Sequence, residues 1–347
     1  MAITRIKVSN FKSFDQLEVE LRPLNIVVGG NAAGKSNFLE IFRFLRDIAV
    51  EGLENAISLQ GGMEFLTNLQ IGPSRPITLE ASFKLDIIPE AGLETSTYTL
   101  ELAATSTSPG FEVISEEVLP NLLPNLDLSV RSLLSFLPAN EISIFDLDPK
   151  LPKKAAPISG RAYLEPDGSN LALVLRNLLQ DPKDRATFIH LVRDVLPFIE
   201  DLDVERFADK SVLISAKELF SERALPASFL SDGTIHLAAL ILALYFHPAS
   251  ITIIEEPERN LHPHLISKLA RMIEDASRKK QIIATTHHPE LVKHADLADL
   301  LLVHRDDQGF SHVTRPAESA ELKVFLENDL GVDELYVQNL LGVGHGV

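Results

Sequence analysis

A glycine-rich segment with the spacing of a phosphate-binding loop begins at Gly29. It reads Gly-Gly-Asn-Ala-Ala-Gly-Lys-Ser and fits the pattern G-x-x-x-x-G-K-[ST]. Glycines let backbone N–H groups approach a phosphate closely, and a helix N-terminus adds a favourable field. In this pattern Lys35 bridges the β- and γ-phosphates, and the Ser36 hydroxyl binds Mg²⁺. The predicted nucleotide contacts are Gly29, Asn31, Ala32, Ala33, Gly34, Lys35, Ser36 and Asn37.

Two adjacent acids, Glu255 and Glu256, end the apolar run Ile-Thr-Ile-Ile and precede a proline. A carboxylate at a strand end beside a phosphate-binding loop can hold Mg²⁺, and a second one can orient or deprotonate the attacking water. We therefore predict Glu255 and Ser36 as metal ligands and Glu256 as the general base. The alternative is a capping pair before the next turn, which the phosphate-binding loop in the same chain makes the weaker interpretation.

A serine–glycine pair and a histidine complete the candidate set. Ser231 and Gly233 precede a long apolar helix pattern, and His287 follows an apolar strand pattern. Alone, Ser231 is better interpreted as an ordinary helix cap, and a lone loop histidine is usually structural. The order of the four elements along the chain favours the chemical interpretation: Ser231 and Gly233 contact an anion, and His287 contacts the γ-phosphate or the catalytic water.

Alternating strands and helices must position these groups. A strand pattern at residues 24–28 leads into the loop, and a helix pattern at 35–48 follows it. Alternating patterns predict an antiparallel sheet from residues 3–8, 16–21, 77–87, 96–102 and 111–118. Helix patterns at 234–246 and 263–276 alternate with strand patterns at 251–255, 281–285 and 299–304. That alternation predicts an α/β fold with a parallel sheet covered by helices.

The middle of the chain differs in composition. Residues 119–157 are rich in Leu and Pro, and helix patterns follow at 169–179 and 183–199. We therefore predict one composite domain in three parts: an N-terminal ATP-binding lobe at 1–118, an inserted mostly helical lobe at 119–225, and a C-terminal half at 226–347. No heptad repeat runs through the middle part, which argues against a long coiled-coil arm.

Composition excludes several classes of protein. The 347 residues carry a formal charge of −17, which argues against a surface coated with basic residues for DNA, although not against a local basic groove. The chain has two small basic groups: Lys150, Lys153 and Lys154 form one, and Arg278, Lys279 and Lys280 form the other. Solvated surface charge is the favoured interpretation of both groups. The absence of cysteine excludes disulfides and thiolate zinc sites. No apolar run of membrane-spanning length and no signal-peptide pattern is visible, so we expect a cytoplasmic protein without a membrane partner.

The four motifs in this order resemble the ABC-type ATPases. The loop with Asn31 and Asn37, preceded by Asn10-Phe11-Lys12-Ser13-Phe14, is similar to the RecF/SMC branch. The segments Glu-Glu-Pro-Glu-x-x-Leu-His-Pro from Glu255 and Thr-His-x-Pro around His287 are similar to the OLD-like predicted ATPases. Two further OLD-like stretches lie at 164–171 and 330–335. The resemblance implies an ABC-type P-loop NTPase with a mixed central sheet covered by helices, an antiparallel N-terminal β subdomain and an inserted helical lobe.

The sequence departs from that family at several positions. Glu255 stands where aspartate is usual, and His288 stands where serine is common. Gln60 and Gln70 are weak candidates for the Q-loop glutamine of these ATPases. Lys12 is a candidate nucleotide contact, with a solvated lysine in a turn as an equal alternative.

The resemblance implies a Mg²⁺-dependent ATPase that forms a nucleotide-sandwich homodimer, in which Ser231 and Gly233 act on the partner's nucleotide. The implied setting is DNA repair or anti-phage defence, with DNA and a separately encoded effector or nuclease as candidate partners. A slow-turnover, ATP-dependent clamp or scaffold is the alternative, and a transporter subunit fits less well. The sequence lacks the [NT]-Lys-x-Asp element for reading guanine, which argues against a GTPase. No Asp-x-Asp follows His287, so we expect any nuclease activity to belong to a partner.

Overall fold

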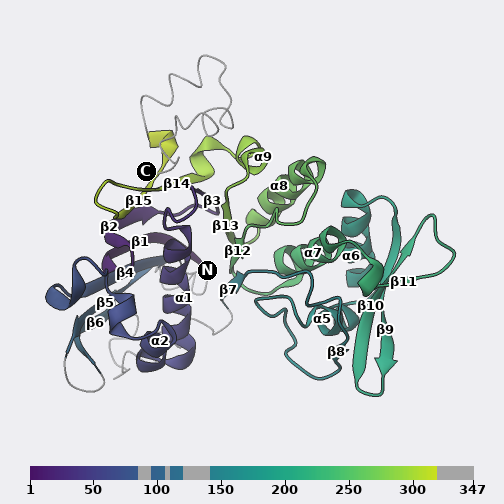
Figure 1. Ribbon diagram of the computed structural model, residues 1–347, viewed down its shortest axis with the longest axis horizontal. Helices are drawn as coiled ribbons and strands as arrows, with labels where there is room; N and C mark the ends of the chain where they lie inside the picture. Colours follow the sequence, from purple (N-terminus) through teal and green to yellow (C-terminus); the bar gives the residue numbers. More distant parts are fainter. Residues whose placement is uncertain (85–94, 106–109, 120–140, 319–347) are drawn as a thin grey trace, which may run out of the picture. The chain divides into compact units, whose positions relative to one another are not determined.

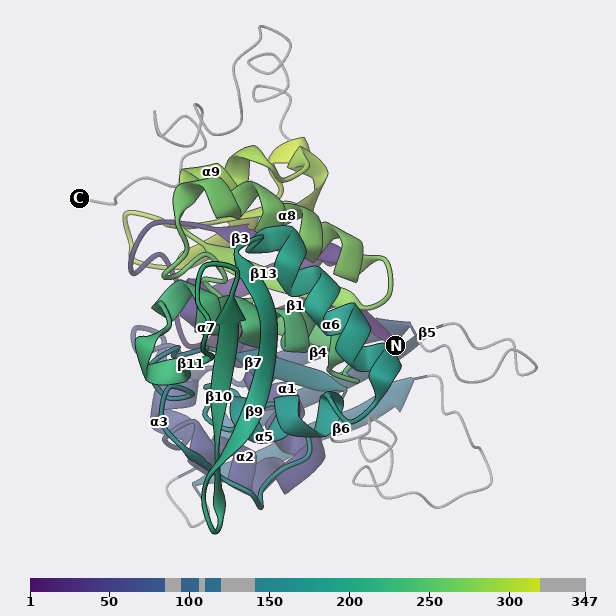
Figure 2. The same cartoon turned by 90° about the vertical axis from the view of Figure 1, so that its right-hand side faces the viewer.

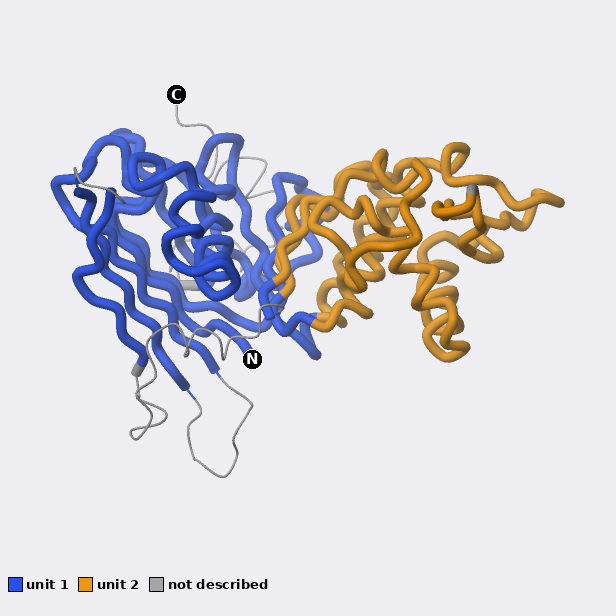
Figure 3. The backbone as a smooth tube through the Cα atoms, turned by 90° about the horizontal axis from the view of Figure 1, so that it is seen from below, with its two compact units in different colours: residues 1–142, 249–251, 277–347 blue, residues 143–248, 252–276 orange. Residues whose placement is uncertain are grey.

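The computed structural model describes residues 1–84, 95–105, 110–119 and 141–318 (Figure 1). The chain divides into two compact units (Figure 3). Unit 1 comprises residues 1–142, 249–251 and 277–347, and unit 2 comprises residues 143–248 and 252–276. The OLD-like stretch at 330–335 and the last residues of the strand expected at 77–87 lie outside the described residues.

Unit 1 contains the antiparallel sheet that the alternating patterns predict. Its strand order is β2-β1-β4-β5-β6, and every neighbouring pair is antiparallel. Alternate residues of β4 are buried, which is the burial expected of a strand with one covered face. The strands are β1 (Ala2–Phe11), β2 (Phe14–Glu20), β4 (Ile77–Lys84), β5 (Thr95–Ala104) and β6 (Phe111–Leu119).

A second group of strands in unit 1 surrounds β3 (Leu24–Val28). Both β13 (Gln281–Thr286) and β14 (Leu300–Arg305) pair with β3 in parallel, and β15 (Ser311–Thr314) pairs with β14 antiparallel. Every residue of β3 is buried, as expected for a central strand of a parallel sheet. The predicted mixed arrangement is therefore confirmed, and Thr286 pairs with Val28 at the carboxyl ends of their strands.

Helix α1 (Lys35–Glu51) starts directly after the glycine-rich loop and packs into the core of unit 1 through buried aromatic residues. The rings of Phe11 in β1 and Phe44 in α1 lie 6.0 Å apart, and both side chains are fully buried. Gly52, with φ 84°, ends the helix, and its N–H donates to Ile48. The remaining helical segments of unit 1 are short: α2 (Leu53–Leu59), α3 (Met63–Leu66), α9 (Pro289–Lys293), and 3₁₀ turns at Gly72–Ser74, Leu297–Asp299 and Pro316–Glu318.

Unit 2 contains helices and a small antiparallel sheet. Its principal helix is α7 (Asp232–Ile241), which continues through a π-helical turn at Leu242–Phe246. Strands β9 and β10 form a hairpin, and α6 contacts β9 (Figure 2). The other elements are β7 (Ile142–Phe145), β8 (Ala156–Pro157), α5 (Leu171–Leu178), α6 (Pro182–Val195), β9 (Ile199–Ala208), β10 (Ser211–Glu218), β11 (Leu225–Pro226), a 3₁₀ turn at Ala227–Phe229, β12 (Ile251–Glu255) and α8 (Pro263–Ser277). The first residue of β7, the first of β12 and the last of α8 belong to unit 1.

The expectation of a mostly helical lobe at 119–225 was incomplete. The described part of that segment contains the two expected helices and also a sheet of β8, β9, β10 and β11. The helix expected at 183–199 stops at Val195, because Leu196 precedes Pro197 and proline disfavours helical geometry in the residue before it. The strand that follows buries Ile199 and Leu202 between acidic residues, which weakened its alternating signal.

No helix within the described ranges is both long enough and apolar enough to cross a bilayer.

Candidate functional site

The glycine-rich loop is shaped by close backbone contacts on both sides. A Cβ atom on Gly29 would lie 2.5 Å from the carbonyl oxygen of Val303 in β14. A Cβ atom on Gly34, whose φ is 116°, would overlap Ser311 Oγ. Ala32 also has positive φ, at 61°. Glycine is therefore required at both ends of the loop, and the backbone forms a cradle that a side chain would fill.

The first turn of α1 offers backbone donors toward this cradle. Its N-cap is Gly34, and no side chain caps the helix N-terminus. The first N–H groups of a helix have no partner within the helix, so this terminus favours an anion. Lys35 Nζ donates to the carbonyl oxygens of Gly29 and Gly30 at 2.7 and 3.0 Å, which keeps the ammonium beside the loop. Ser36 is exposed at the same turn. These residues fit a nucleoside triphosphate, whose Mg²⁺ would supply charge neutralisation at the phosphates.

A serine that the sequence analysis missed supports the loop from β15. Ser311 is fully buried, and its Oγ donates to the carbonyl oxygen of Ala33 at 2.7 Å. The Ser311 N–H donates to the carbonyl oxygen of Ser13 at 2.8 Å, which ties the Asn-Phe-Lys-Ser-Phe turn to the loop. Ser13 Oγ is buried and has no hydrogen-bond partner among the described residues. The register of the β14–β15 hairpin sets these contacts, and no sequence pattern announces that register.

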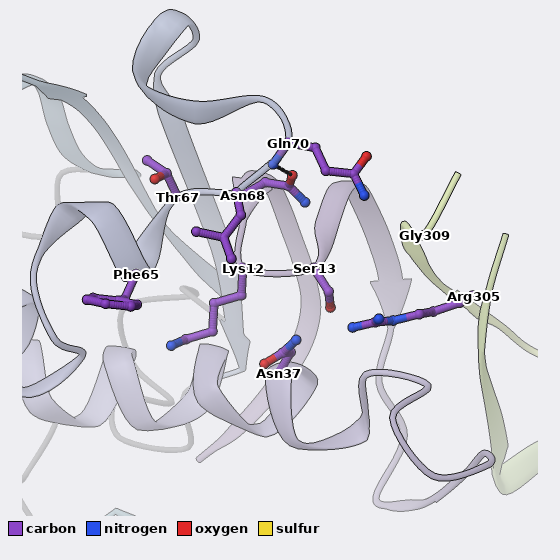
Figure 4. A pocket seen from close by; sticks show the side chains of 10 residues that line it. Lys12, Ser13, Asn37, Phe65, Thr67, Asn68, Gln70, Arg305 and Gly309 are labelled. Atoms are coloured by element: carbon purple, nitrogen blue, oxygen red, sulfur yellow. Dashed lines mark hydrogen bonds between the residues drawn. The ribbon is translucent and has the colours of Figure 1, made fainter. Parts of the chain in front are cut away.

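A polar pocket adjoins this loop within unit 1 and has a volume of about 280 Å³. Lys12, Ser13, Asn37 and Arg305 line it, and Figure 4 shows Lys12 and Arg305 on either side of Asn37. Lys12 is half-buried, and this burial lowers its pKa although the charge of Glu40 opposes the shift. Lys12 is thus placed next to the predicted nucleotide contact Asn37, and its own contact with nucleotide stays a proposal. Arg305 was not identified from the sequence.

The two candidate glutamines have structural partners within unit 1. Gln60 Nε2 donates to Glu40 Oε2 at 2.8 Å, and Gln70 Nε2 donates to the carbonyl oxygen of Gln308 at 2.9 Å. Gln70 also lines the polar pocket. Neither contact identifies the Q-loop glutamine.

His287 lies at the same sheet edge as the loop. It follows β13 directly and is exposed, and the parallel pairing of Thr286 with Val28 brings the ends of β13 and β3 together. The next residue, His288, is the N-cap of α9: its Nδ1 accepts from the N–H of Glu290 at 3.2 Å. Serine is a common N-cap residue, so histidine replaces serine here in a capping role. His287 remains the predicted γ-phosphate or water contact.

Glu255 and Glu256 stand at the end of β12. The strand is apolar up to Glu255, and Glu256 takes a left-handed backbone conformation with φ 44°. The N–H of Arg259 donates to the carbonyl oxygen of Glu256 at 2.9 Å and closes the turn. A positive φ is unusual for glutamate and marks a constrained position, as often found at functional sites. The metal role of Glu255 and the base role of Glu256 stay predictions.

The serine–glycine pair starts α7 in unit 2. Ser231 is the N-cap, and its Oγ accepts from the N–H of Thr234 at 3.0 Å. The capping interpretation of Ser231 is therefore confirmed, and its contact with an anion stays a prediction. A Cβ atom on Gly233 would lie 2.8 Å from the carbonyl oxygen of Asn260, so the start of α7 packs closely on the turn after β12.

His236 joins α7 to the same turn. It is 1% exposed, and its Nε2 lies 3.0 Å from the carbonyl oxygen of Pro257, so the neutral ring donates from Nε2. Its Nδ1 is buried without a hydrogen-bond partner in the described structure. Burial lowers the pKa of His236 to about 4, against the smaller raising effect of the Pro257 carbonyl. No local sequence pattern marks this histidine.

This burial gives His236 a predictable effect on stability. The unfolded chain binds a proton at His236 below its ordinary pKa of 6.5, and the folded chain does so only near pH 4. The contribution of neutral His236 to the unfolding free energy is therefore complete above about pH 6.5. This contribution is lost as the pH falls toward 4, and the loss amounts to at most about 3 kcal/mol. We expect His236→Gln, whose amide can still donate to Pro257, to make the loss of unfolding free energy between these pH values shallower. Urea titrations across this range measure it, and equal slopes in both proteins would contradict it.

The predicted site residues fall in both units. Unit 1 holds the loop, Lys12 and His287, and unit 2 holds Glu255, Glu256, Ser231 and Gly233. Within the described residues, no cluster of three or more His, Asp and Glu side chains could hold a metal ion. The metal-binding roles of Ser36 and Glu255 stay predictions.

A family model described as "AAA domain, putative AbiEii toxin, Type IV TA system" matches residues 24–293, from β3 to the end of α9. The chain belongs to this family. The match includes the phosphate-binding loop, the acidic strand end and His287, and it supports the assignment to the ABC-type, RecF/SMC-like P-loop ATPases.

Relatives agree with this assignment. A DNA replication and repair protein RecF from Desulforudis audaxviator is 42% identical over 66 residues, which is 18% of this chain and 18% of the relative. An SMC head bound to the C-winged helix domain of ScpA has a TM-score of 0.63 at 15% identity, covering 90% of this chain and 97% of that one. The SMC head domain from Thermotoga maritima has a TM-score of 0.57 at 15% identity, covering 91% and 99%. At such identity the likeness shows the fold, so the predicted ABC-type P-loop fold is confirmed.

Proposed function

We propose that this AAA-domain protein binds ATP with Mg²⁺ and hydrolyses it. The observation that carries the proposal is the cradle between β3 and α1: Gly34 at φ 116°, a helix N-terminus without a side-chain cap, and Lys35 Nζ beside the loop carbonyls. Backbone donors and one ammonium group are the groups that bind a triphosphate. The family match over this segment supports the same conclusion.

The residues have distinct proposed roles. The loop and Lys35 bind the β- and γ-phosphates, and Ser36 and Glu255 hold Mg²⁺. Glu256 accepts the proton of the attacking water, and His287 hydrogen-bonds the γ-phosphate or that water. The pocket with Lys12 and Asn37 extends the nucleotide site from the loop.

We further propose that the working form is a homodimer that encloses ATP between its subunits. The sequence has one copy of each motif, and a serine–glycine pair at the start of a helix suits the γ-phosphate of a second chain. Two-fold symmetry then gives two identical composite sites, in which Ser231 and Gly233 act in trans. Hydrolysis removes the phosphate that joins the halves.

The proposed setting is DNA repair or anti-phage defence together with a partner effector. One relative is named a DNA replication and repair protein, which suggests DNA as a partner. One structural neighbour is bound to a domain of ScpA, which suggests an accessory protein as a partner. The family description, with its toxin–antitoxin system, favours defence. The alternative is an ATP-dependent clamp or scaffold in which binding, rather than turnover, controls a separate nuclease.

Steady-state ATP hydrolysis with and without DNA tests these proposals. We expect Mg²⁺-dependent phosphate release by the purified protein and no nicking of supercoiled plasmid. DNA stimulation would favour a motor or switch. Tight ATP binding with turnover far below the roughly 1–10³ per second typical of enzymes would favour the clamp. Absence of both ATP binding and hydrolysis would overturn the proposed function.

A further inference from the structure

Two charged residues outside the predicted site lie near Glu256, the proposed general base, in unit 2: Arg259 contacts Glu256, and Asp146 contacts Arg259. Arg259 lies three residues after Glu256, in the turn that follows β12, and Asp146 follows β7 directly. Strands β7 and β12 are hydrogen-bonded neighbours, so Asp146, which follows β7, lies close to the turn that follows β12. Arg259 occupies an unspecified position of the Glu-Glu-Pro-Glu-x-x-Leu-His-Pro segment, and Asp146 lies outside all of the predicted motifs.

One guanidinium group bridges the two carboxylates. Arg259 Nη1 donates to Asp146 Oδ1 at 2.8 Å, and Nη2 donates to Glu256 Oε2 at 3.2 Å. Nε lies 3.4 Å from the same Glu256 oxygen. The planar fork of arginine presents its N–H groups in fixed directions, so two acceptors on different strands can be held at once. A lysine in this place would supply the charge without that geometry.

We propose that Arg259 is a positioning residue for Glu256 and that Asp146 anchors Arg259. This inference rests on the proposed function, because it assigns the orientation of the base in ATP hydrolysis. Because two guanidinium nitrogens contact Oε2, rotation of the Glu256 carboxylate is restricted. Asp146 restrains the guanidinium from the neighbouring strand, so that the hydrogen bonds to Glu256 lose less entropy on forming.

The backbone of the turn supports this role. Glu256 is held at φ 44° and its carbonyl oxygen accepts from the Arg259 N–H at 2.9 Å, so residues 256 and 259 are fixed relative to each other before their side chains meet. The packing of Gly233 against the Asn260 carbonyl and of His236 against the Pro257 carbonyl holds the same turn from α7. The arginine is thereby attached to a constrained segment, which is what a positioning group requires.

Kinetics of single and double variants test the proposal. Arg259→Ala should lower kcat for ATP about 10-fold, a part of the 10²–10⁴-fold that a general base contributes. Asp146→Ala should lower kcat about 3-fold, and KM for ATP should stay within about 2-fold in both, since neither side chain is assigned to nucleotide binding. The double variant should lose no more than Arg259→Ala alone, because Asp146 acts only through Arg259. Arg259→Lys should fall between wild type and Arg259→Ala.

A second ion pair of unit 2 provides the matched control. Arg185 Nη2 lies 2.6 Å from Asp201 Oδ2 with similar exposure, on α6 and β9. Arg185→Ala and Asp201→Ala should leave kcat and KM unchanged. In a Glu256→Gln background, adding Arg259→Ala should change residual turnover by less than about 2-fold, because the residue acts through the base.

Three results would overturn the inference: an Arg259→Ala protein that turns over as fast as wild type, a raised KM with unchanged kcat, or full additivity of the two alanine variants. Wild-type protein without ATP turnover would instead defeat the proposed function. Circular dichroism and thermal melting confirm that the compared variants are folded, which the 40% and 52% side-chain exposure of Arg259 and Asp146 favours.

Discussion

Replacing Glu256 with Gln should lower ATP turnover by roughly 10²–10⁴-fold, which is the contribution of a general base. Glutamine keeps the size of the side chain, and its amide oxygen can still accept from Arg259 Nη2, which contacts Glu256 Oε2 at 3.2 Å in the wild-type protein. The turn after β12 should therefore stay intact. Since ATP binding continues while hydrolysis stops, an ATP-bound dimer should accumulate.

Light scattering with ATP and Mg²⁺ measures this dimer directly. Ser231→Arg provides the comparison, because a long cation at the start of α7 should block closure while leaving ATP binding to the monomer unchanged. A Glu256→Gln protein that remains monomeric with ATP bound, at protein concentrations of tens of micromolar, would contradict the nucleotide-sandwich homodimer. Normal turnover in that variant would remove Glu256 from the role of base.

The Lys35→Ala protein should lose Mg–ATP binding. Lys35 Nζ lies beside the carbonyl oxygens of Gly29 and Gly30, at the loop where the phosphates are proposed to bind. Truncating one partner of a hydrogen-bonded charge pair that is shielded from solvent costs about 2–5 kcal/mol, so affinity should fall roughly 30-fold to several thousand-fold. Calorimetry with ATP and Mg²⁺ measures the change.

Lys7→Ala is the matched control for this experiment. Lys7 is an exposed lysine on β1 in the same unit, so its removal changes the net charge equally without touching the loop. Its ATP affinity should equal that of the wild type. Equal affinity in Lys35→Ala would remove the assignment of the phosphate-binding loop.

Short-range patterns gave a correct account of the elements that hold the loop. The apolar run into Gly29 is β3, and the helix expected from Lys35 starts at that residue. The antiparallel N-terminal strands and the strand before His287 also match the structure. These predictions depend on local properties: the alternation of apolar residues and the conformational freedom of glycine. In the missed hairpin of β9 and β10, two acidic residues separate the buried Ile199 and Leu202 of β9, so the alternating pattern was weak.

What the sequence determined by itself is the set of candidate reacting groups, because a phosphate-binding loop and a pair of acids after an apolar run are encoded by neighbouring residues. What only the tertiary structure decided is what surrounds those groups. Ser311 reaches the carbonyl oxygen of Ala33 from a strand near the other end of the chain, and His236 meets Pro257 across a turn. Asp146 reaches Arg259 from a separate strand. Such contacts depend on strand register and helix packing, which join residues distant in sequence and leave no local pattern.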